Sequence, residues 1–281
     1  MSGASAVAEA PPVRLSRVCL ARVQVELRQF FREREAVVFI FAFPVVMLVI
    51  FASAFASQRD FVNGGGGSIG AAQYYLTGMI STGIMLTSFQ NLATFIAVER
   101  DDGTLKRLHG TPMPPIAFFI GKIGQVLVTT AVQLALLIVV AHVGYGVALP
   151  ATLGHWVRFG WLLLLGSAAG TVLGIAFSSV PRSGRSASAL VTPIVIVLQF
   201  ISGVYFTYGD LPAWMRGVAS VFPLRWMAQG MRSVFLPPEL VAAEPGGSWH
   251  LGTGAVVLAV WFVGGLALAV RSFRWMRRDD G

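Results

Sequence analysis

The chain has 281 residues, of which 55% are hydrophobic and 12% are charged, and its mean hydropathy is +0.71. This composition excludes an ordinary soluble domain, in which about a quarter of the residues carry a charge. The formal net charge is +8, but the basic residues flank apolar runs and do not form one basic domain. Anionic lipid headgroups, and not nucleic acid, are therefore the expected partners of these charges.

The N-terminal part divides into residues 1–13, which we expect to be disordered, and residues 14–35, which we expect to form a cytoplasmic interfacial elbow helix. Such a helix places its apolar stripe toward lipid and its arginines toward phosphate. Cys19 is the single cysteine, so a disulfide within the chain is excluded and a reduced thiol is expected. The apolar residues of this segment recur at helical spacing: Leu15, Cys19, Val23, Leu27, Phe30 and Phe31.

Residues 36–270 contain six apolar runs, each long enough to cross the ~30 Å hydrocarbon layer as a helix. Six crossings place both ends of the chain on one side of the membrane. Sixteen basic residues fall on the side of the termini and five on the opposite side, which predicts cytoplasmic termini and a basic cytoplasmic tail at residues 271–281. The runs span residues 36–57, 74–98, 116–140, 156–177, 189–207 and 251–270.

On the outer side, residues 211–223 are too short and too interrupted by proline to span, yet too apolar for a solvated loop. Short extracellular helices, re-entrant or lying on the membrane surface and capped on entry by Asp210, are expected there. Residues 237–249 are rich in Gly and Pro and predict an ordinary loop. The four glycines at residues 64–67 predict a flexible first outer loop.

Two further patterns concern helix packing and the membrane boundary. Gly166, Gly170 and Gly174 recur every four residues and predict close packing of the fourth span against another helix. Three aromatic residues at the outer end of the fifth span predict an interfacial belt, with an exit gate as the alternative: Tyr205, Phe206 and Tyr208.

The usual motifs for nucleotide or metal chemistry are missing. The sequence has no Gly-x-x-x-x-Gly-Lys-Ser/Thr loop, no HExxH and no CxxC, so we predict no catalytic residues, no metal site and no cofactor in this chain. The 13 acidic residues lie outside the apolar interiors of the spans, where proton- or sodium-driven carriers commonly keep an ionisable group. Energy for uphill transport is therefore expected from another chain.

The loop between the second and third spans carries mixed charge in a helix-like order. Asp101 and Asp102 favour the first turn of a short helix, and Gly103 allows the bend before it. Lys106 and Arg107 suit its last turn, after which a proline-rich stretch ends the helix. By pattern alone, a coupling element for a soluble motor and a plain charged loop beside the membrane both remain open.

A resemblance to a known family rests on this segment, which reads Glu99-Arg100-Asp101-Asp102-Gly103-Thr104-Leu105-Lys106-Arg107-Leu108 and continues to Thr111-Pro112. The segment resembles the cytoplasmic signature of type-2 ATP-binding-cassette (ABC) exporter permeases, which include daunorubicin-resistance-like drug efflux permeases and polysaccharide-export permeases. Residues 211–232 also resemble that family's extracellular segment before the last span. The likeness covers nearly the whole chain.

The resemblance implies a half-transporter in the bacterial plasma membrane. Two six-span subunits, as a homodimer or a heterodimer, face each other, and two copies of a separate ATPase that binds ATP and Mg dock on their cytoplasmic side. The elbow helix is also implied to touch the ATPase. The implied coupling helix consists of Glu99, Arg100, Asp101, Asp102, Gly103, Thr104, Leu105, Lys106 and Arg107.

The family resemblance also places spans two and five beside the central substrate cleft. Polar side chains at lipid depth prefer protein or water to hydrocarbon, so those of the two spans are cleft candidates, with hydrogen bonding between helices as the alternative. The selected candidates are Thr87, Gln90, Asn91, Gln199 and Ser202.

The sequence thus predicts a non-enzymatic permease that exports a hydrophobic or amphipathic compound, such as a drug, antibiotic or lipid, by alternating access. Export of a lipid-linked glycan or a polysaccharide is the alternative within the family. An ion channel would need a polar ring in its spans, and none is evident. An intramembrane lipid-modifying enzyme would need a nucleophile, base or metal group, for which only scattered His and Ser residues are present.

Overall fold

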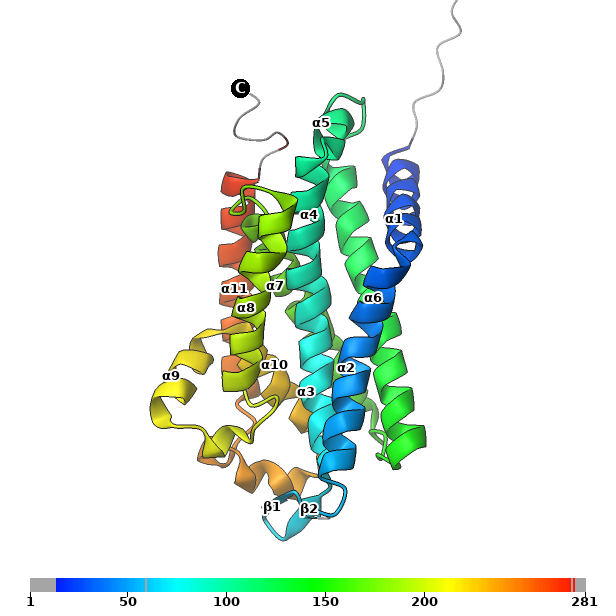
Figure 1. Cartoon of the computed structure of the whole chain (residues 1–281). Coiled ribbons are helices and arrows are strands. Elements are labelled where there is room, and N and C mark those ends of the chain that lie inside the picture. Colours follow the sequence, from blue (N-terminus) through cyan, green and yellow to red (C-terminus); the bar gives the residue numbers. More distant parts are fainter. Residues whose placement is uncertain (1–13, 59, 274, 276–281) are drawn as a thin grey trace, which may run out of the picture.

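The computed structural model describes residues 14–58, 60–273 and 275. Residues 1–13, whose disorder the sequence predicts, and most of the predicted tail lie outside the described residues. The long helices run side by side and form an elongated bundle (Figure 1). The α-helices are α1 (Leu15–Arg32), α2 (Arg34–Ala54), α3 (Ala71–Met85), α4 (Leu92–Asp101), α5 (Thr104–His109), α6 (Pro115–Tyr145), α7 (Leu153–Phe177), α8 (Gly184–Ile201), α9 (Ala213–Val221), α10 (Pro223–Phe235) and α11 (Leu251–Ser272).

Among the described residues, five helices are long and apolar enough to cross a membrane: α2, α6, α7, α8 and α11. The second predicted span is instead a rod of three pieces in series, α3, the π-helical turn η1 (Leu86–Asn91) and α4. Single π-turns inside α-helices frequently lie at functional sites. The chain is therefore an all-α polytopic membrane protein, and the predicted count of six spans includes this rod as one crossing.

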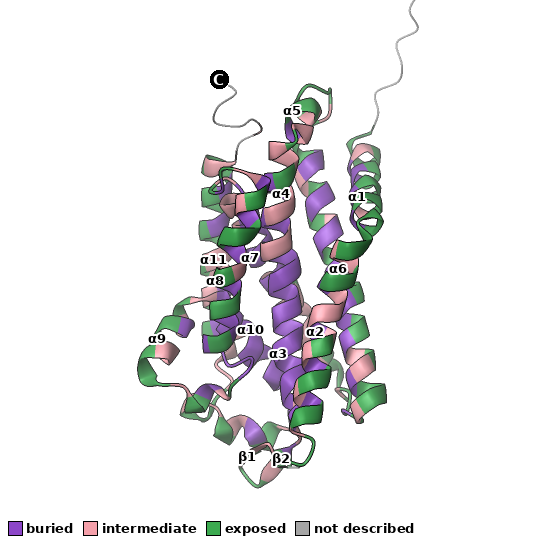
Figure 2. Ribbon diagram, in the orientation of Figure 1, coloured by how far each residue is buried: buried purple, intermediate pink, exposed green. Residues whose placement is uncertain are grey.

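The rod lies in the centre of the bundle, and nearly every residue of α3 is buried (Figure 2). The predicted glycine stripe of α7 packs against it, as the space around two glycines shows. A Cβ on Gly170 would lie 2.0 Å from the Ser88 hydroxyl, and a Cβ on Gly174 would lie 2.9 Å from the Ser88 carbonyl oxygen. The small residues thus let α7 approach the π-turn closely.

Helix α8 covers residues 184–201, so it begins and ends earlier than the predicted span at residues 189–207. The chain turns at Gly203, whose φ of +76° and contact with Tyr208 suit only glycine. Tyr205 and Tyr208 are buried within the protein at 8% and 5% exposure. The aromatic belt prediction is therefore wrong for both tyrosines, whereas Phe206 is 54% exposed.

One end of the bundle carries α5, the start of α1 and the end of α11, whereas the opposite end carries the strands β1 (Val62–Gly64) and β2 (Gly67–Ile69) (Figure 1). The strands pair antiparallel, and their turn uses Gly65 and Gly66 at φ values of +58° and +86°, as a two-residue hairpin turn of type I′ requires. The glycine run predicted as a flexible loop is therefore a β-hairpin.

The same end of the bundle contains the two short helices expected before the last span, α9 and α10, and every residue of α10 except Trp226 is buried. The prediction that Asp210 caps this helix is wrong, because α9 begins directly after Pro212. Asp210 ends the 3₁₀ turn η2 (Tyr208–Asp210) and accepts a hydrogen bond from Thr207. The predicted loop at residues 237–249 contains two more 3₁₀ turns, η3 (Pro238–Ala243) and η4 (Pro245–Gly247).

Helix α1 packs along the first half of α6. At ~1.5 Å per residue, the 31 residues of α6 extend ~46 Å, which exceeds the ~30 Å hydrocarbon layer. The face of α1 that packs against α6 carries Cys19, Arg22, Glu26 and Phe30, all of them buried. The prediction that the apolar stripe faces lipid and the arginines face phosphate is therefore wrong for these residues. The interfacial position of α1 stays a prediction.

Candidate functional site

Helix α5 buries Leu105, half-buries Thr104 and Leu108, and exposes its other residues. Gly103 precedes it with a φ of +77°, and the Thr104 amide donates to Asp102 Oδ1 at 2.8 Å. Leu105 is fully buried in an apolar cluster with residues of α4, α6 and α7. Lys106 and Arg107 are exposed. The expected short helix is thus present and presents basic residues outward.

Two of the predicted coupling residues point into the protein. Arg100 donates hydrogen bonds to the Ser178 carbonyl and, at 3.2 Å, to the Ser178 hydroxyl at the end of α7. Asp101 Oδ2 accepts a hydrogen bond from the Gly184 amide, at 3.3 Å, in the first turn of α8. These contacts tie the end of α4 to the end of α7 and to the start of α8.

A buried charge cluster, which consists of Arg22, Glu26, Glu99 and Lys122, joins α4 to α1 and α6. Lys122 is 1% exposed, and its Nζ lies 2.8 Å from Glu26 Oε2 and 2.5 Å from Glu99 Oε1. Arg22 donates to the same Glu26 carboxylate. Two cations and two carboxylates thus neutralise one another, which burial of charge requires.

Sequence reasoning selected Glu99 but missed the other three members of the charge cluster. A signal existed in α1, where Cys19, Arg22, Glu26 and Phe30 share one helical face and place two opposite charges inside an apolar stripe. Lys122 gave no comparable signal, because a lysine near a span end also satisfies the positive-inside rule. A cavity of about 350 Å³ adjoins the cluster and is lined by Arg32, Glu99, Asp102, Thr104 and Lys122, among others.

The cleft candidates around the π-turn contact two neighbouring helices. Thr87 donates to Gln133 Oε1 at 2.9 Å, and Gln133 in turn donates to the Ile40 carbonyl of α2 at 2.7 Å. Gln90 donates to Thr192 Oγ1 of α8 at 3.3 Å. Asn91 keeps a buried amide nitrogen with no hydrogen-bond partner. Hydrogen bonding between helices, the alternative considered for these residues, thus describes Thr87 and Gln90.

The other two candidates lie further along α8, toward the hairpin end. Gln199 is buried, and its Oε1 accepts a hydrogen bond from the Tyr205 hydroxyl at 2.5 Å. The hydroxyl of Ser202 is fully buried without a hydrogen-bond partner. The structure therefore brings Gln90 near Thr192 and Gln199 near Tyr205.

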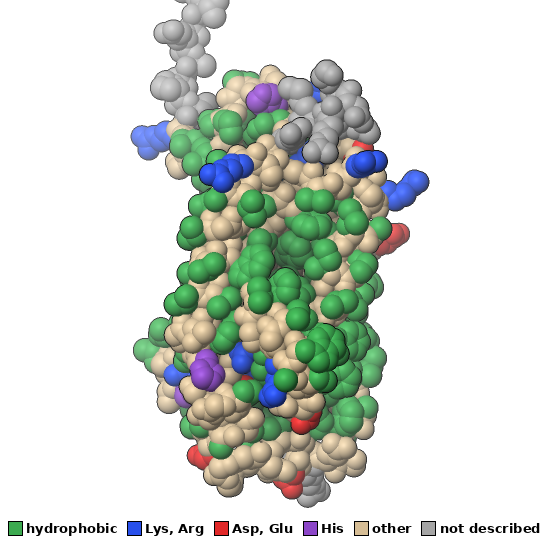
Figure 3. Space-filling view, turned by 90° about the vertical axis from the view of Figure 1, so that its left-hand side faces the viewer, with side chains coloured by type: hydrophobic (Ala, Val, Ile, Leu, Met, Phe, Trp, Pro, Cys, Tyr) green, Lys and Arg blue, Asp and Glu red, His purple; other side chains and the backbone are tan. Residues whose placement is uncertain are grey.

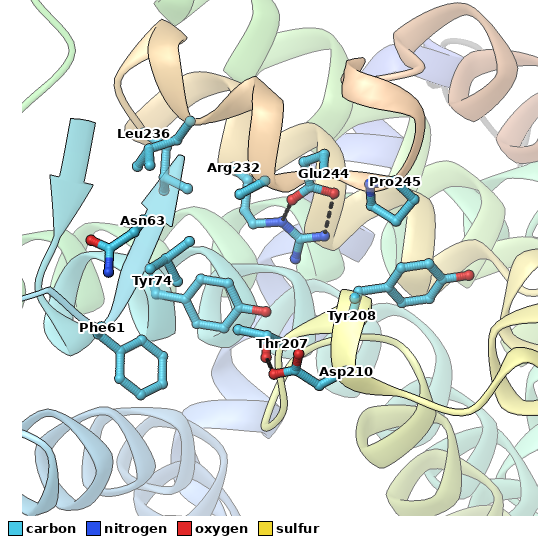
Figure 4. A pocket seen from close by; sticks show the side chains of 14 residues that line it. Phe61, Asn63, Tyr74, Thr207, Tyr208, Asp210, Arg232, Leu236, Glu244 and Pro245 are labelled. Carbon is cyan, nitrogen blue, oxygen red and sulfur yellow. Dashed lines mark hydrogen bonds and ion pairs between the residues drawn. The ribbon is translucent and has the colours of Figure 1, made fainter. Parts of the chain in front are cut away.

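A second buried network, missed by sequence reasoning, lies at the hairpin end (Figure 4). Arg232 is 1% exposed and pairs with Glu244 through two nitrogens, and its guanidinium lies 5.6 Å from the ring centre of Tyr74. Burial, the largest single influence, acts to lower the pKa of Arg232, but Glu244, Tyr74 and Tyr208 together raise this pKa above its ordinary value. These residues line a cavity of about 300 Å³ together with Asp210.

Helices of this length and apolarity, five of them among the described residues, define the chain as a multi-pass membrane protein. The family model described as "ABC-2 type transporter" matches residues 17–236, which is most of the chain. The chain therefore belongs to this family and is a permease subunit, whose family members work with an ATPase on a separate subunit. No curated protein matches the chain.

Proposed function

We propose that this permease subunit exports a hydrophobic or amphipathic compound across the bacterial plasma membrane, with both termini in the cytoplasm. The observation that carries the proposal is the way α5 is joined to the bundle. Its exposed Lys106 and Arg107 offer a docking surface, while Leu105 and the adjoining end of α4 are held by buried contacts. A displacement of α5 therefore moves the rod.

The mechanism is alternating access driven from the ATPase side. Two ATPase subunits, each binding ATP and Mg, dock on a pair of permease subunits and close on one another. The charge cluster passes the resulting displacement of α4 to α1 and α6, and Arg100 passes it to α7. Rigid packed elements switch between discrete arrangements more readily than they deform, so the substrate cleft changes from inward to outward exposure.

The cleft is built around Thr87, Gln90, Asn91, Gln199 and Ser202. The hydrogen bond from Gln90 to Thr192, which joins the rod to α8, is 3.3 Å long, whereas those of Thr87 and Gln199 are 2.9 Å and 2.5 Å. Unpartnered hydrogen-bonding groups on Asn91 and Ser202 offer sites for a polar group of an otherwise apolar cargo. Export of a lipid-linked glycan or a polysaccharide is the second candidate, and direct cargo measurements distinguish the two.

The test is reconstitution of the permease with its ATPase in liposomes, followed by ATP-dependent movement of an amphipathic fluorescent dye. Arg107→Glu reverses a charge on α5, whereas Arg216→Glu makes the same change on α9 at the opposite end. We expect Arg107→Glu to weaken ATPase binding and dye movement and Arg216→Glu to leave both unchanged. Equal effects of the two variants, or dye movement without any ATPase, would contradict the proposal.

A further inference from the structure

An apolar groove runs along the outside of the bundle between α8 and α11, because α11 packs on α7 whereas α8 packs on α4. The groove encloses about 380 Å³, and Ser272 is the one polar residue among those that line it. Its wall includes residues of α3, η1, α7, α8 and α11, namely Met85, Phe89, Ala176, Leu198, Trp261 and Ser272.

The groove is open to the surroundings of the bundle. Val180, Ile194 and Leu268 line it and are 60%, 40% and 55% exposed. Figure 3 shows the face that carries α8 and α11, where a broad band of apolar side chains lies below a level of basic side chains. In a membrane protein such a face meets lipid or a second subunit, and where it meets lipid the groove is a lateral recess.

The length of the groove matches one leaflet of a bilayer. On α11 its lining extends from Trp261 to Ser272, which is ~16 Å at ~1.5 Å per residue. One leaflet contributes ~15 Å, half of the ~30 Å hydrocarbon layer. Trp261 closes the far end, where its Nε1 donates to the Val221 carbonyl at 2.6 Å and its ring stacks on Phe222.

The open end of the groove has the charge that an anionic headgroup needs. Ser272 follows the exposed Arg271, and Val180 lies two residues before the exposed Arg182. Each basic residue near a membrane surface contributes about 1 kcal/mol to the binding of anionic lipid, which is about fivefold in affinity. Apolar walls of one-leaflet length below two arginines therefore fit a phospholipid with a negative headgroup.

We propose that this groove binds one acyl chain of an anionic phospholipid from the leaflet at the α5 end of the bundle. The chain end reaches Trp261 and passes Phe89 of the π-turn on the way. A bound lipid thus contacts the part of the rod that carries the candidate cleft residues. The site is separate from the ATPase docking surface, so its test needs no ATPase and its failure leaves the proposed function untouched.

The test is native mass spectrometry of the purified chain after exposure to equal amounts of phosphatidylglycerol and phosphatidylcholine. We expect one retained phosphatidylglycerol per chain in preference to phosphatidylcholine. Ala176→Phe fills part of the groove and should lower lipid retention about tenfold, because about two methylenes of the acyl chain lose their place in the groove. Ala267→Phe, on the exposed side of α11, is the matched control and should retain the lipid. Arg182→Gln with Arg271→Gln should remove the headgroup preference.

A second measurement tests the orientation of the chain without relying on those variants. Brominated acyl chains quench nearby tryptophan, and the difference between wild type and Trp261→Phe isolates the signal of Trp261. Bromine near the chain end should quench this signal more than bromine near the headgroup. Equal retention of the two lipids by wild type, equal retention by the two alanine variants, or equal quenching from both bromine positions would overturn the proposal.

A second copy of this chain is the competing occupant. Leu268→Cys in a Cys19→Ala background places the single cysteine of the chain on the groove wall. Under the lipid proposal this variant stays without a disulfide between chains on oxidation. Rapid formation of that disulfide would show that a second copy covers the groove and would overturn the proposal.

Discussion

Removal of the Lys122 ammonium tests whether the buried charge cluster holds α1 and α4 to α6. Lys122→Met keeps much of the side-chain volume but leaves the carboxylates of Glu26 and Glu99 without the cation that joins them. Breaking a buried ion pair by removal of one partner costs about 3–5 kcal/mol. Because Arg22 still pairs with Glu26, the charge left uncompensated is that of Glu99, so we expect a loss near 3 kcal/mol.

The assay is unfolding of the purified protein in mixed detergent micelles, followed by tryptophan fluorescence. Lys106→Met removes an exposed lysine and should change the free energy of unfolding by less than about 0.5 kcal/mol. Adding Glu99→Gln to Lys122→Met removes the orphaned charge and should recover about 1–3 kcal/mol of the loss, the usual coupling between residues in contact. A loss from Lys122→Met below about 1 kcal/mol, or no recovery in the double variant, would refute the reasoning.

Three further substitutions test other parts of the structure. Gly103→Ala should destabilise the turn before α5 by about 1 kcal/mol, because the φ of Gly103 is +77°. The variant should also lower transport-coupled ATP turnover while membrane insertion stays normal. Unchanged ATP turnover would mean that this segment only anchors the topology of the chain. Gly170→Ala should lower the free energy of unfolding by about 1–3 kcal/mol through a clash with a serine hydroxyl, whereas Gly264→Ala, which meets open space, should not; equal midpoints in a denaturant titration would contradict the packing. Glu244→Gln should cost about 3 kcal/mol because it leaves a buried arginine without its counter-charge, whereas the exposed Glu239→Gln should have little effect in the same titration.

The spans and the short helix α5 could be predicted from the sequence because their causes are local. A run of apolar residues, the glycine before Thr104 and the prolines after the helix each act over a few positions. The end of α8 was misplaced because residues 202–207 carry no charged side chain, and hydropathy does not register a turn at Gly203. The π-turn was missed because a single turn of six residues is too short to change the pattern of apolar residues along the second span.

The buried networks could not be predicted in the same way, because they join residues far apart in the chain. Lys122 meets Glu26 across 96 residues, and a lysine beside a membrane has a common alternative at the surface. Arg232 is one of the five basic residues predicted on the outer side, yet it is buried against Glu244, which lies in the segment whose composition predicts an ordinary loop. Charges in apolar surroundings need partners, but only the tertiary fold determines which ones they find.

Hydrogen bonding between helices, the alternative to a place in the substrate cleft, accounts for some of the cleft candidates. Thr87 and Gln90 donate to side chains of other helices, as buried polar groups do in membrane proteins. Ser202 and Asn91 keep unpartnered atoms, and a sequence cannot distinguish these two situations. Their role in binding cargo therefore rests on transport measurements with single substitutions.

The central claim is that α5 lies in the cytoplasm and is bound by the ATPase. The most direct measurement is labelling with a membrane-impermeant maleimide in a Cys19→Ala background, with the cysteine introduced at Lys106 or, on the hairpin, at Ser68; both positions are exposed. In intact cells we expect labelling of Ser68→Cys alone. In opened membranes Lys106→Cys should react and should be protected by co-expressed ATPase. Labelling of Lys106→Cys from outside, or full reactivity with the ATPase bound, would contradict the account.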